Sequence, residues 1–594
     1  MIAVDGATVE VIRNYLVSVA EQMRRSLVRT AFSPVIYDIL DFGISIYDGQ
    51  LRLMAETAGG ATFLGANDYS IRKIVDYIGV ERFEPGDVVL LNYPYWSAAH
   101  AYDAVLTAPV FETGTRLPVA YLCVRGHWMD LGAKDPGYVL DSTSVHQEGL
   151  MFPGTRLVKG GVIDEELLEL IRYNSRMPES VIGDFHAQLT AIKTGERRLH
   201  QIYEKFGRPM VEAAVTRILD HGELQALRAL RGLPHGSWTA VDWLDDDGVT
   251  DRMIRMEVTI TIDDETFTAD FSGSERAVPG PVNMPYGATH GMVKAVFKAL
   301  TTPHEPRNGG HLRPVRTVAP PGTLFHAIYP AATFTLWTQM VALELLHKAL
   351  AQGVPTIAAS SGGDEPGFMA VGAYPNGRTW VISNNEGIGW GGAPDHDGAN
   401  AQQHLIVNVI RNTPIEILES KTPLFHHRLE LTTDSGGPGQ YRGGLGVRRD
   451  VSFVAEGEVL SMKKKTKTRP WALHGGFEPE PSAIVLWPGT PRERVVGRGG
   501  SYISMFRQHM AAKEGFTNFS AGGAGYGDPL HRDPKAVVND VLEGYVSREA
   551  AQRDYGVIVD STGTWRLAES RAAATTPEDS AAKVAPDNAH TKVE

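Results

Sequence analysis

Two strand-like apolar segments in the first quarter of the chain each adjoin the same four-residue pattern, histidine-x-x-aspartate. The first is HAYD at residues 100–103, and the second is HWMD at residues 127–130. Imidazole and carboxylate together are the ligand set that suits Zn, Mn or Fe(II). If the strands bring the side chains of both patterns to one point, these side chains form a metal site.

The pattern also has a chance explanation. The chain contains 20 histidines and 70 acidic residues, so such a spacing is expected somewhere without any functional reason. Two of them at the ends of neighbouring strands are less expected, yet spacing alone leaves both interpretations open.

Length and composition indicate a multi-domain α+β protein. A chain of 594 residues is too long for one core, and its 62 glycines favour a turn-rich chain over a helical bundle. The formal net charge of −13 argues against nucleic acid or an anionic membrane as the main partner. Because no stretch is apolar enough to span a bilayer, we expect a cytoplasmic protein.

The order of predicted elements divides the chain into three domains of mixed β-sheets with flanking helices, followed by a tail. Apolar residues at helical spacing predict helices over 8–30, 164–173, 185–206, 284–302 and 336–352. Strands are expected within a β-rich block over 35–125, and Gly-rich loops over 380–447. The predicted units are an N-terminal domain 1–235, a central domain 236–447, a β-rich domain 448–570 with a closing helical element, and a disordered tail 571–594.

Two further features have competing interpretations. Cys123, the only cysteine, lies in the apolar segment PVAYLCVRG and is expected to be buried and inert rather than nucleophilic. The basic run at residues 463–469 (KKKTKTR) is typical of a solvated loop or a protected edge strand. Its functional alternatives are docking to an acidic partner or attraction of an anionic substrate. No G-x-x-x-x-G-K-[ST] phosphate loop is present.

Several longer motifs occur in an order that matches one known family across about residues 10–560. They are DFGISIYDG (41–49), GDVVLLNYPYWSAAHAYD (86–103), RGHWMDLGAKDPG (125–137), NSRMP (174–178), HDGAN (396–400), NTPIE (412–416), YRGGLG (441–446) and GGAGYGDP (522–529). With these motifs the chain resembles the hydantoinase B / 5-oxoprolinase / acetone carboxylase alpha-subunit family.

The resemblance implies one divalent metal, which Zn, Mn, Fe or Co would serve. Carried over to this chain, the implied ligands are Asp41, His100, Asp103 and His127. Asp130 is then expected to orient an imidazole from outside the ligand set, so that Asp130 and His127 are the implied catalytic pair. The alternative for Asp130 is an aspartate that caps a turn.

The chain departs from the family pattern just before His100. Where the family has N-D-P-Y-x-G-G-x-H, this chain has NYPYWSAAH at residues 92–100, so Tyr93 replaces an aspartate, and Ser97 and Ala98 replace two glycines. The loop is therefore expected to be bulkier and more aromatic, with a more apolar pocket.

Family resemblance also implies a partner and a reaction. Members work with a hydantoinase A-like ATPase subunit that uses ATP and Mg²⁺, so a hetero-oligomer is expected. The leading hypothesis is the metal-bearing subunit of an ATP-dependent cyclic-amide hydrolase of the hydantoinase, oxoprolinase or lactamase type. One alternative is a subunit of an ATP-dependent ketone carboxylase that acts on a small ketone. A second alternative is a non-catalytic scaffold that retains only subunit assembly.

Overall fold

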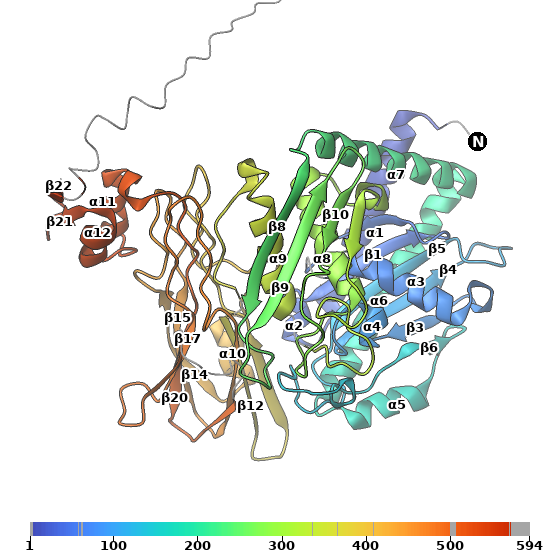
Figure 1. Ribbon diagram of the computed structural model, residues 1–594. Helices are drawn as coiled ribbons and strands as arrows, with labels where there is room; N and C mark the ends of the chain where they lie inside the picture. The colour runs from blue at the N-terminus through green and yellow to red at the C-terminus, as the bar shows by residue number, and fades with distance from the viewer. Residues whose placement is uncertain are drawn as a thin grey trace, which may run out of the picture.

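A computed structural model describes residues 4–571 apart from 58, 61–62, 64, 335–336, 365, 408, 499–506 and 570. The N-terminal sheet with its helices, a central sheet and a β-rich part follow one another across the molecule (Figure 1). The predicted tail over 571–594 lies, apart from Arg571, outside the described residues. Within the described residues, no helix combines the length and the apolar character needed to cross a bilayer.

The N-terminal part is built on a seven-stranded sheet in the order β2-β1-β5-β4-β3-β6-β7. Its strands are β1 (Phe42–Asp48), β2 (Leu53–Glu56), β3 (Val88–Leu91), β4 (Asp103–Val110), β5 (Ala120–His127), β6 (Pro153–Lys159) and β7 (Val162–Ile163). Its helices are α1 (Gly6–Thr30), α2 (Pro34–Tyr37), α3 (Ala66–Ile78), α4 (Pro94–Ser97), α5 (Glu165–Asn174), α6 (Pro178–Phe206) and α7 (Arg208–Arg231).

Both faces of this sheet are covered, which explains why β1, β4 and β5 read as continuous apolar runs. One face packs against α1 and α6 in a single large core. The other face packs against α3 and includes Cys123, which is fully buried as predicted. Burial raises the pKa of this thiol to about 12, so it is protonated and inert at neutral pH.

Helix α3 is an element that the sequence patterns did not predict, since residues 35–125 were expected to be β-rich. Its segment contains β-branched residues that favour strands, but Ile71, Ile74 and Ile78 recur at helical spacing and are all buried. Helix α7 was also missed, because it follows α6 after the single residue Gly207. The predicted helices at 8–30 and 185–206 are confirmed as α1 and as the larger part of α6.

The central part is a four-stranded sheet in the order β11-β10-β9-β8, packed against α8 (Tyr286–Thr301) and α9 (Trp337–Leu350). Its strands are β8 (Gly236–Leu244), β9 (Ile254–Ile262), β10 (Phe267–Asp270) and β11 (Val315–Val318). Strand β9 alternates between buried and half-buried residues, so the predicted inward direction of Val258, Ile260 and Ile262 is confirmed.

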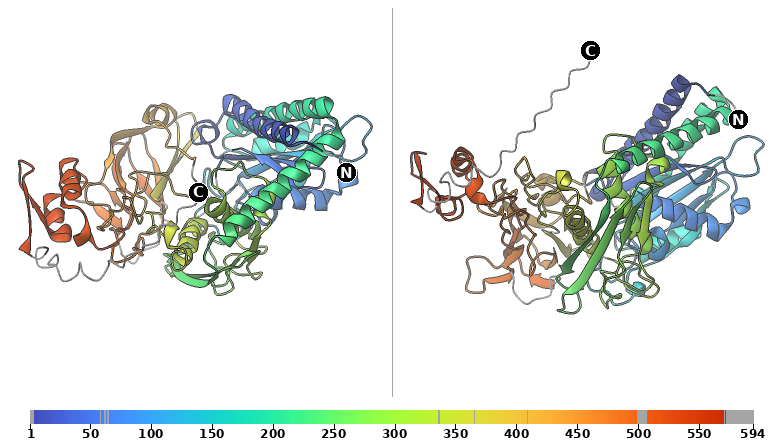
Figure 2. Two further views of the ribbon diagram at one scale, coloured as in Figure 1. Left: turned by 90° about the horizontal axis from the view of Figure 1, so that it is seen from above. Right: turned by 45° about the horizontal axis from the view of Figure 1, so that its top comes forward.

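The β-rich part contains two further sheets, in the orders β13-β12-β16-β19 and β14-β15-β20-β17-β18. Their strands are β12 (Pro366–Ala373), β13 (Thr379–Asn384), β14 (Leu424–Leu431), β15 (Val447–Phe453), β16 (Gly457–Lys463), β17 (Ala483–Leu486), β18 (Arg494–Gly497), β19 (Arg507–Met510) and β20 (Gly515–Phe519). The remaining elements are α10 (Ile415–Lys421), α11 (Pro534–Leu542), α12 (Arg548–Tyr555), β21 (Val557–Val559) and β22 (Trp565–Leu567). Figure 2 shows α11 and α12, in red, far from the N-terminus.

The predicted boundary at residues 447–448 separates strands that pair with each other. Strand β14 pairs with β15 across it, and β12 pairs with β16. Both sheets of the β-rich part therefore draw strands from either side of this position, and β12 and β16 pair although other strands separate them in the sequence. The other boundary, at 235–236, lies between α7 and β8.

The basic run at 463–469 is not a solvated loop, and this prediction was wrong. The side chains of Lys464 and Lys465 are 0% and 1% exposed. Lys464 Nζ lies 3.0 Å from Asp246 Oδ1, and Lys465 Nζ lies 3.2 Å from Asp242 Oδ2. The carboxylate of Asp245 accepts hydrogen bonds from the backbone of residues 466–468. A cluster of aspartates at the end of β8 and directly after it thus neutralises the run and joins the β-rich part to the central part.

Candidate metal centre

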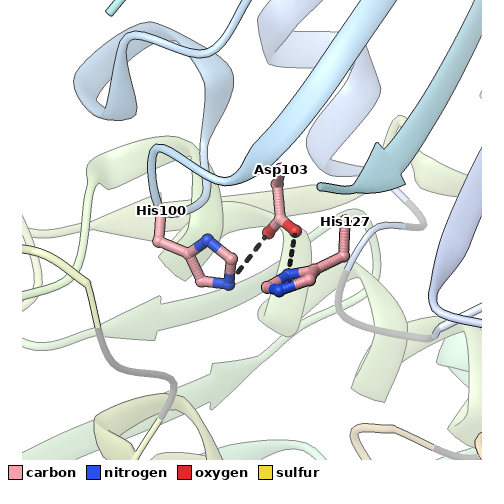
Figure 3. A group of neighbouring side chains, drawn as sticks. All are labelled: His100, Asp103 and His127. Atoms are coloured by element: carbon pink, nitrogen blue, oxygen red, sulfur yellow. Dashed lines mark hydrogen bonds and ion pairs between the residues drawn. The ribbon is translucent and has the colours of Figure 1, made fainter. Parts of the chain in front are cut away.

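Antiparallel pairing brings parts of both histidine-x-x-aspartate patterns together. Asp103 begins β4, His127 ends β5, and the two residues are direct cross-strand partners. His100 lies in the loop that leads into β4. One ligand atom from each of these three residues lies within 4.8 Å of the others, and Figure 3 shows the side chains facing one another. The two patterns therefore contribute to one centre, but unequally.

The centre is buried and has polar atoms without partners. His100, Asp103 and His127 are 1%, 0% and 1% exposed. His127 Nδ1 lies 3.3 Å from Asp103 Oδ1, and His100 Nε2 lies 3.5 Å from Asp103 Oδ2. Among the described residues, hydrogen-bond partners are lacking for His100 Nδ1, His127 Nε2 and Asp103 Oδ2. Buried polar atoms are costly when unsatisfied, so this donor set fits a divalent cation.

The electrostatics of His100 and Asp103 suit that role, whereas Asp103 favours the protonated form of His127 while no cation is bound. Burial, assisted by the neighbouring His127, lowers the pKa of His100 to about 4, which keeps its imidazole neutral, as a metal ligand must be. Burial opposes ionisation of Asp103, but the two histidines outweigh it and lower the pKa of this carboxyl. Burial also opposes the charged form of His127, but its hydrogen bond with Asp103 raises its pKa.

Asp41 borders the centre without joining the three converging atoms. Its Oδ2 lies 4.0 Å from His127 Nδ1, and its backbone oxygen accepts from the His127 amide at 3.3 Å. Burial, with the added repulsion of Asp103, raises the pKa of Asp41 to about 7. Asp41, which the family resemblance placed in the ligand set, therefore lies next to the three converging residues. Its carboxylate oxygen would have to move closer to them to bind a shared ion.

Asp130 was expected to orient an imidazole. Its hydrogen bonds within the described part of the chain go to other groups. Its carboxylate accepts from Arg176 Nε at 2.9 Å and Nη2 at 2.6 Å, from the Tyr102 hydroxyl at 2.8 Å, and from the Gly132 amide at 3.1 Å. Arg176 takes both oxygens, so the turn-capping interpretation describes these contacts better. Asp130 reaches the centre only through Tyr102, whose ring lies 6.1 Å from that of His127.

Arg125 is a charged residue that sequence reasoning did not single out. It is fully buried on β5, two residues before His127. Its guanidinium donates to Asn67 Oδ1 at 2.9 Å, Ser70 Oγ at 3.0 Å and the Ser97 carbonyl at 2.6 Å. Its charge favours the ionised forms of the nearby Asp41 and Asp103. An arginine inside the apolar strand segment PVAYLCVRG was the available signal.

Two aromatic rings support the histidines, and no sequence pattern indicated either of them. The His100 ring stacks on Phe334, with centroids 4.7 Å apart and planes 5° apart. The His127 ring stacks on Tyr138 at 5.3 Å and 19°. Phe334 lies more than two hundred residues beyond both histidines, so no local pattern could associate them. The stacking fixes both imidazole planes.

Glu148 holds the segment that carries Phe334. Its Oε1 accepts from the Thr333 amide and from Ser142 Oγ, both at 2.8 Å, and its Oε2 accepts from Thr333 Oγ1 at 3.2 Å. The Tyr95 hydroxyl holds the same segment by donating to the Ala331 carbonyl at 2.7 Å. The aromatic loop before His100 therefore packs against this supporting segment. Glu148 is the residue through which the protein positions the ring beneath His100.

The stability conferred by Glu148 is expected to depend on pH. Burial raises the pKa of Glu148 to about 7, above its unfolded value of roughly 4.3. Its contribution is thus complete below about pH 4.3 and is lost as the pH rises through 7, a total of roughly 4 kcal/mol. Glu148→Gln mimics the protonated acid and avoids the loss. Urea unfolding at pH 5 and pH 8 should show wild type losing stability relative to this variant, whereas a constant difference contradicts the assignment.

The loop before His100 also shows how the missing family glycines are accommodated. Ala98 adopts φ 62° and ψ 30° at the end of α4. This left-handed conformation is one that glycine adopts without strain and that alanine adopts at a cost. The backbone of this loop therefore keeps a conformation that suits glycine. In the same loop, the rings of Tyr93 and Trp96 pack edge to face with their centroids 5.2 Å apart.

Comparison with known proteins gives matches over most of the chain. Residues 5–529 match the model of the Hydantoinase B/oxoprolinase family. A protein of Pseudomonas sp. (strain NS671), assigned as the hydantoinase B component of a D-/L-hydantoinase, is 30% identical over 94% of this chain and 95% of its own length. The beta subunit of the caprolactamase of Pseudomonas jessenii is 28% identical over 95% of this chain and 98% of its own length.

Solved structures show the same architecture. The ATP-dependent caprolactamase of Pseudomonas jessenii superposes with a TM-score of 0.86 at 26% identity, covering 96% of this chain and 99% of its own. Nucleotide-free acetone carboxylase superposes with a TM-score of 0.86 at 18% identity, covering 98% of this chain and 84% of its own, and shows a shared fold. From the family match, these relatives and the mixed α/β architecture, we conclude that this chain belongs to the hydantoinase B/oxoprolinase family.

Proposed function

We propose that this chain is the metal-bearing subunit of an ATP-dependent cyclic-amide hydrolase that opens a hydantoin, lactam or oxoproline-like ring. The observation that carries the proposal is the buried convergence of His100, Asp103 and His127, in which one ligand-type atom of each lacks a hydrogen-bond partner among the described residues. In this scheme Asp41 is the fourth ligand, and one Zn, Mn, Fe or Co ion is bound. Within this family we expect the protein to act in the cytoplasm.

The residues of the centre divide the work between them. A bound divalent cation would polarise a carbonyl and lower the pKa of a water molecule. His100 and His127 would hold it through neutral imidazoles whose planes Phe334 and Tyr138 fix. Asp103 supplies negative charge at a site from which bulk water is excluded by burial, so that electrostatic interactions there are strong.

The amide itself needs prior activation, which we assign to a hydantoinase A-like ATPase subunit with ATP and Mg²⁺. An amide carbonyl is stabilised by resonance, and phosphorylation of its oxygen creates a good leaving group. This chain lacks a Walker phosphate loop. It also spans only 40% of the 5-oxoprolinase of Dictyostelium discoideum, which leaves the rest of that longer protein for such a function. We therefore expect a hetero-oligomer.

Reconstitution tests the proposed reaction. The chain is mixed with its hydantoinase A-like partner, ATP, Mg²⁺ and a panel of hydantoins and lactams, and ring opening is followed by chromatography. We expect ATP-dependent opening of one ring class, independent of bicarbonate, with neither subunit active alone. Turnover by the isolated chain, or turnover without ATP, contradicts the scheme.

A ketone carboxylase subunit is the second candidate. The observation that favours it is aromatic: Tyr93, Tyr95 and Trp96 form a cluster of rings in the loop that leads to His100. Such a loop suits an aryl or otherwise bulky ketone. Ketone loss that requires bicarbonate in the same reconstituted mixture would establish this reaction in place of ring opening.

A further inference from the structure

A cavity of about 320 Å³ lies beside α9 (Trp337–Leu350). The buried part of its polar wall is formed by Glu344 and His347 of α9 and by His404 of a later loop. Asp395 and His396 also line the cavity, and Trp390 and Ile388 contribute apolar surface. This volume is at the lower end of the range for small-molecule sites and holds far more than a single water molecule. None of the three residues of the metal centre lines this cavity, so the two sites are separate.

Glu344 is a buried carboxylate with weak support. It is 3% exposed, and its Oε1 lies 3.6 Å from His404 Nε2 and 3.4 Å from the Gly362 amide nitrogen. Both distances are long for a charged acceptor. Within the described residues, no lysine or arginine forms an ion pair with it. A buried carboxylate in this position is costly unless a positive group approaches it.

The neighbouring imidazoles interact with Glu344 but are not permanently charged groups such as lysine or arginine. The Ile406 amide donates to His404 Nδ1 at 3.3 Å, which makes Nδ1 the acceptor nitrogen and places the proton of a neutral ring on Nε2. Burial lowers the pKa of His347, so this ring is also neutral at pH 7. Burial opposes ionisation of Glu344, but its interaction with His404 lowers its pKa. Glu344 therefore places a negative charge in the buried part of the polar wall, while Asp395 and His396 hydrogen-bond to each other at its exposed edge.

The rest of the lining indicates what kind of cation fits. Among the described residues, only His100, Asp103 and His127 converge closely enough to hold a metal ion, so Glu344, His347 and His404 do not form such a cluster. The indole nitrogen of Trp390 donates to the Gln403 carbonyl at 2.8 Å, which fixes its ring at the cavity. An aromatic ring beside a carboxylate suits an organic ammonium group, and the apolar surface suits a hydrocarbon body.

We propose that this cavity binds a small primary amine in its protonated form, with the ammonium group on Glu344 and an apolar body against Trp390 and Ile388. Opening a cyclic amide releases a molecule of this class, so under the proposed function the site would bind the product. Amine binding itself does not depend on that reaction, and it is measured without turnover.

Calorimetry on the full chain tests the proposal with n-hexylammonium chloride as probe and 1-hexanol as its neutral counterpart. We expect saturable 1:1 binding of the ammonium compound. The affinity for the alcohol should be lower by a factor of roughly ten or more. Glu344→Gln should weaken ammonium binding by a similar factor. Glu169→Gln, at an exposed position on α5, is the matched control and should bind as wild type does.

Three results would overturn the proposal. Equal affinity for hexylammonium and hexanol in wild type would show that no charge is recognised, and this comparison requires no variant. Unchanged binding in a folded Glu344→Gln protein would place the amine elsewhere. A second equivalent of bound metal that disappears in Glu344→Gln would assign the cavity to an inorganic cation.

Discussion

His100→Ala is expected to abolish stoichiometric metal binding and to reduce turnover of the reconstituted enzyme by roughly a thousandfold or more. The substitution removes one of three converging ligand atoms and leaves Asp103 with His127 alone. It also removes the ring that stacks on Phe334. Elemental analysis of the purified protein gives the metal content, and the ATP-dependent assay gives the turnover.

The matched control for this prediction is His221→Ala, an exposed histidine on α7. It should retain the metal content and turnover of the wild type. If His100→Ala binds as much metal as His221→Ala and turns over as fast, the three buried residues are not the metal centre. Absence of stoichiometric metal from the wild type would instead favour the non-catalytic scaffold.

Lys464→Met is expected to destabilise the protein by about 3–5 kcal/mol, because it removes the buried lysine that pairs with the buried carboxylate of Asp246. Lys464 is fully buried, its Nζ lies 3.0 Å from Asp246 Oδ1, and it lies 4.2 Å above the Trp337 ring. The double variant Lys464→Met/Asp246→Asn removes both charges. It should recover most of the lost stability, since a neutral pair of similar volume carries no desolvation cost of ions. Urea unfolding of both variants measures the difference.

Lys193→Met, at an exposed position on α6, controls for the loss of a lysine and should change stability by less than about 0.5 kcal/mol. A Lys464→Met protein as stable as this control would show that the buried charges are not coupled. A double variant no more stable than Lys464→Met would show the same.

Regular elements with strong patterns could be predicted from the sequence. The segment FGISIYD became β1, which is buried on both faces. The alternation at residues 258–262 belongs to β9, where the burial pattern follows the strand period. Helix α3 could not be predicted with the same ease, since its isoleucines favour strands and only their helical spacing indicates otherwise. Pairing across residue 447 depends on contacts between distant strands, which local patterns do not contain.

The candidate centre was predictable only in part. His100, Asp103 and His127 stood out because histidine and aspartate recur at the ends of apolar runs. Asp130 stood out for the same reason, yet Arg176 takes up its carboxylate. A pattern of residue types cannot distinguish a carboxylate that faces an imidazole from one that faces an arginine.

Other residues of the site had no signal at all. Phe334 and Glu148 act through a stacked ring and a set of hydrogen bonds between segments far apart in the sequence. The basic run was misread for a similar reason. Its positive residues look solvated until the aspartates at the end of β8 and directly after it are placed against them.

The buried lysine–aspartate contact limits how the chain can be dissected. A fragment that ends at residue 447 would keep the aspartates at 242–247 without the lysines that neutralise them, and the complementary fragment would carry those lysines without acceptors. Neither piece should fold well when produced alone. Produced together, the two pieces have complementary charges that specify how they reassemble, so split-protein complementation is the appropriate way to study the parts separately.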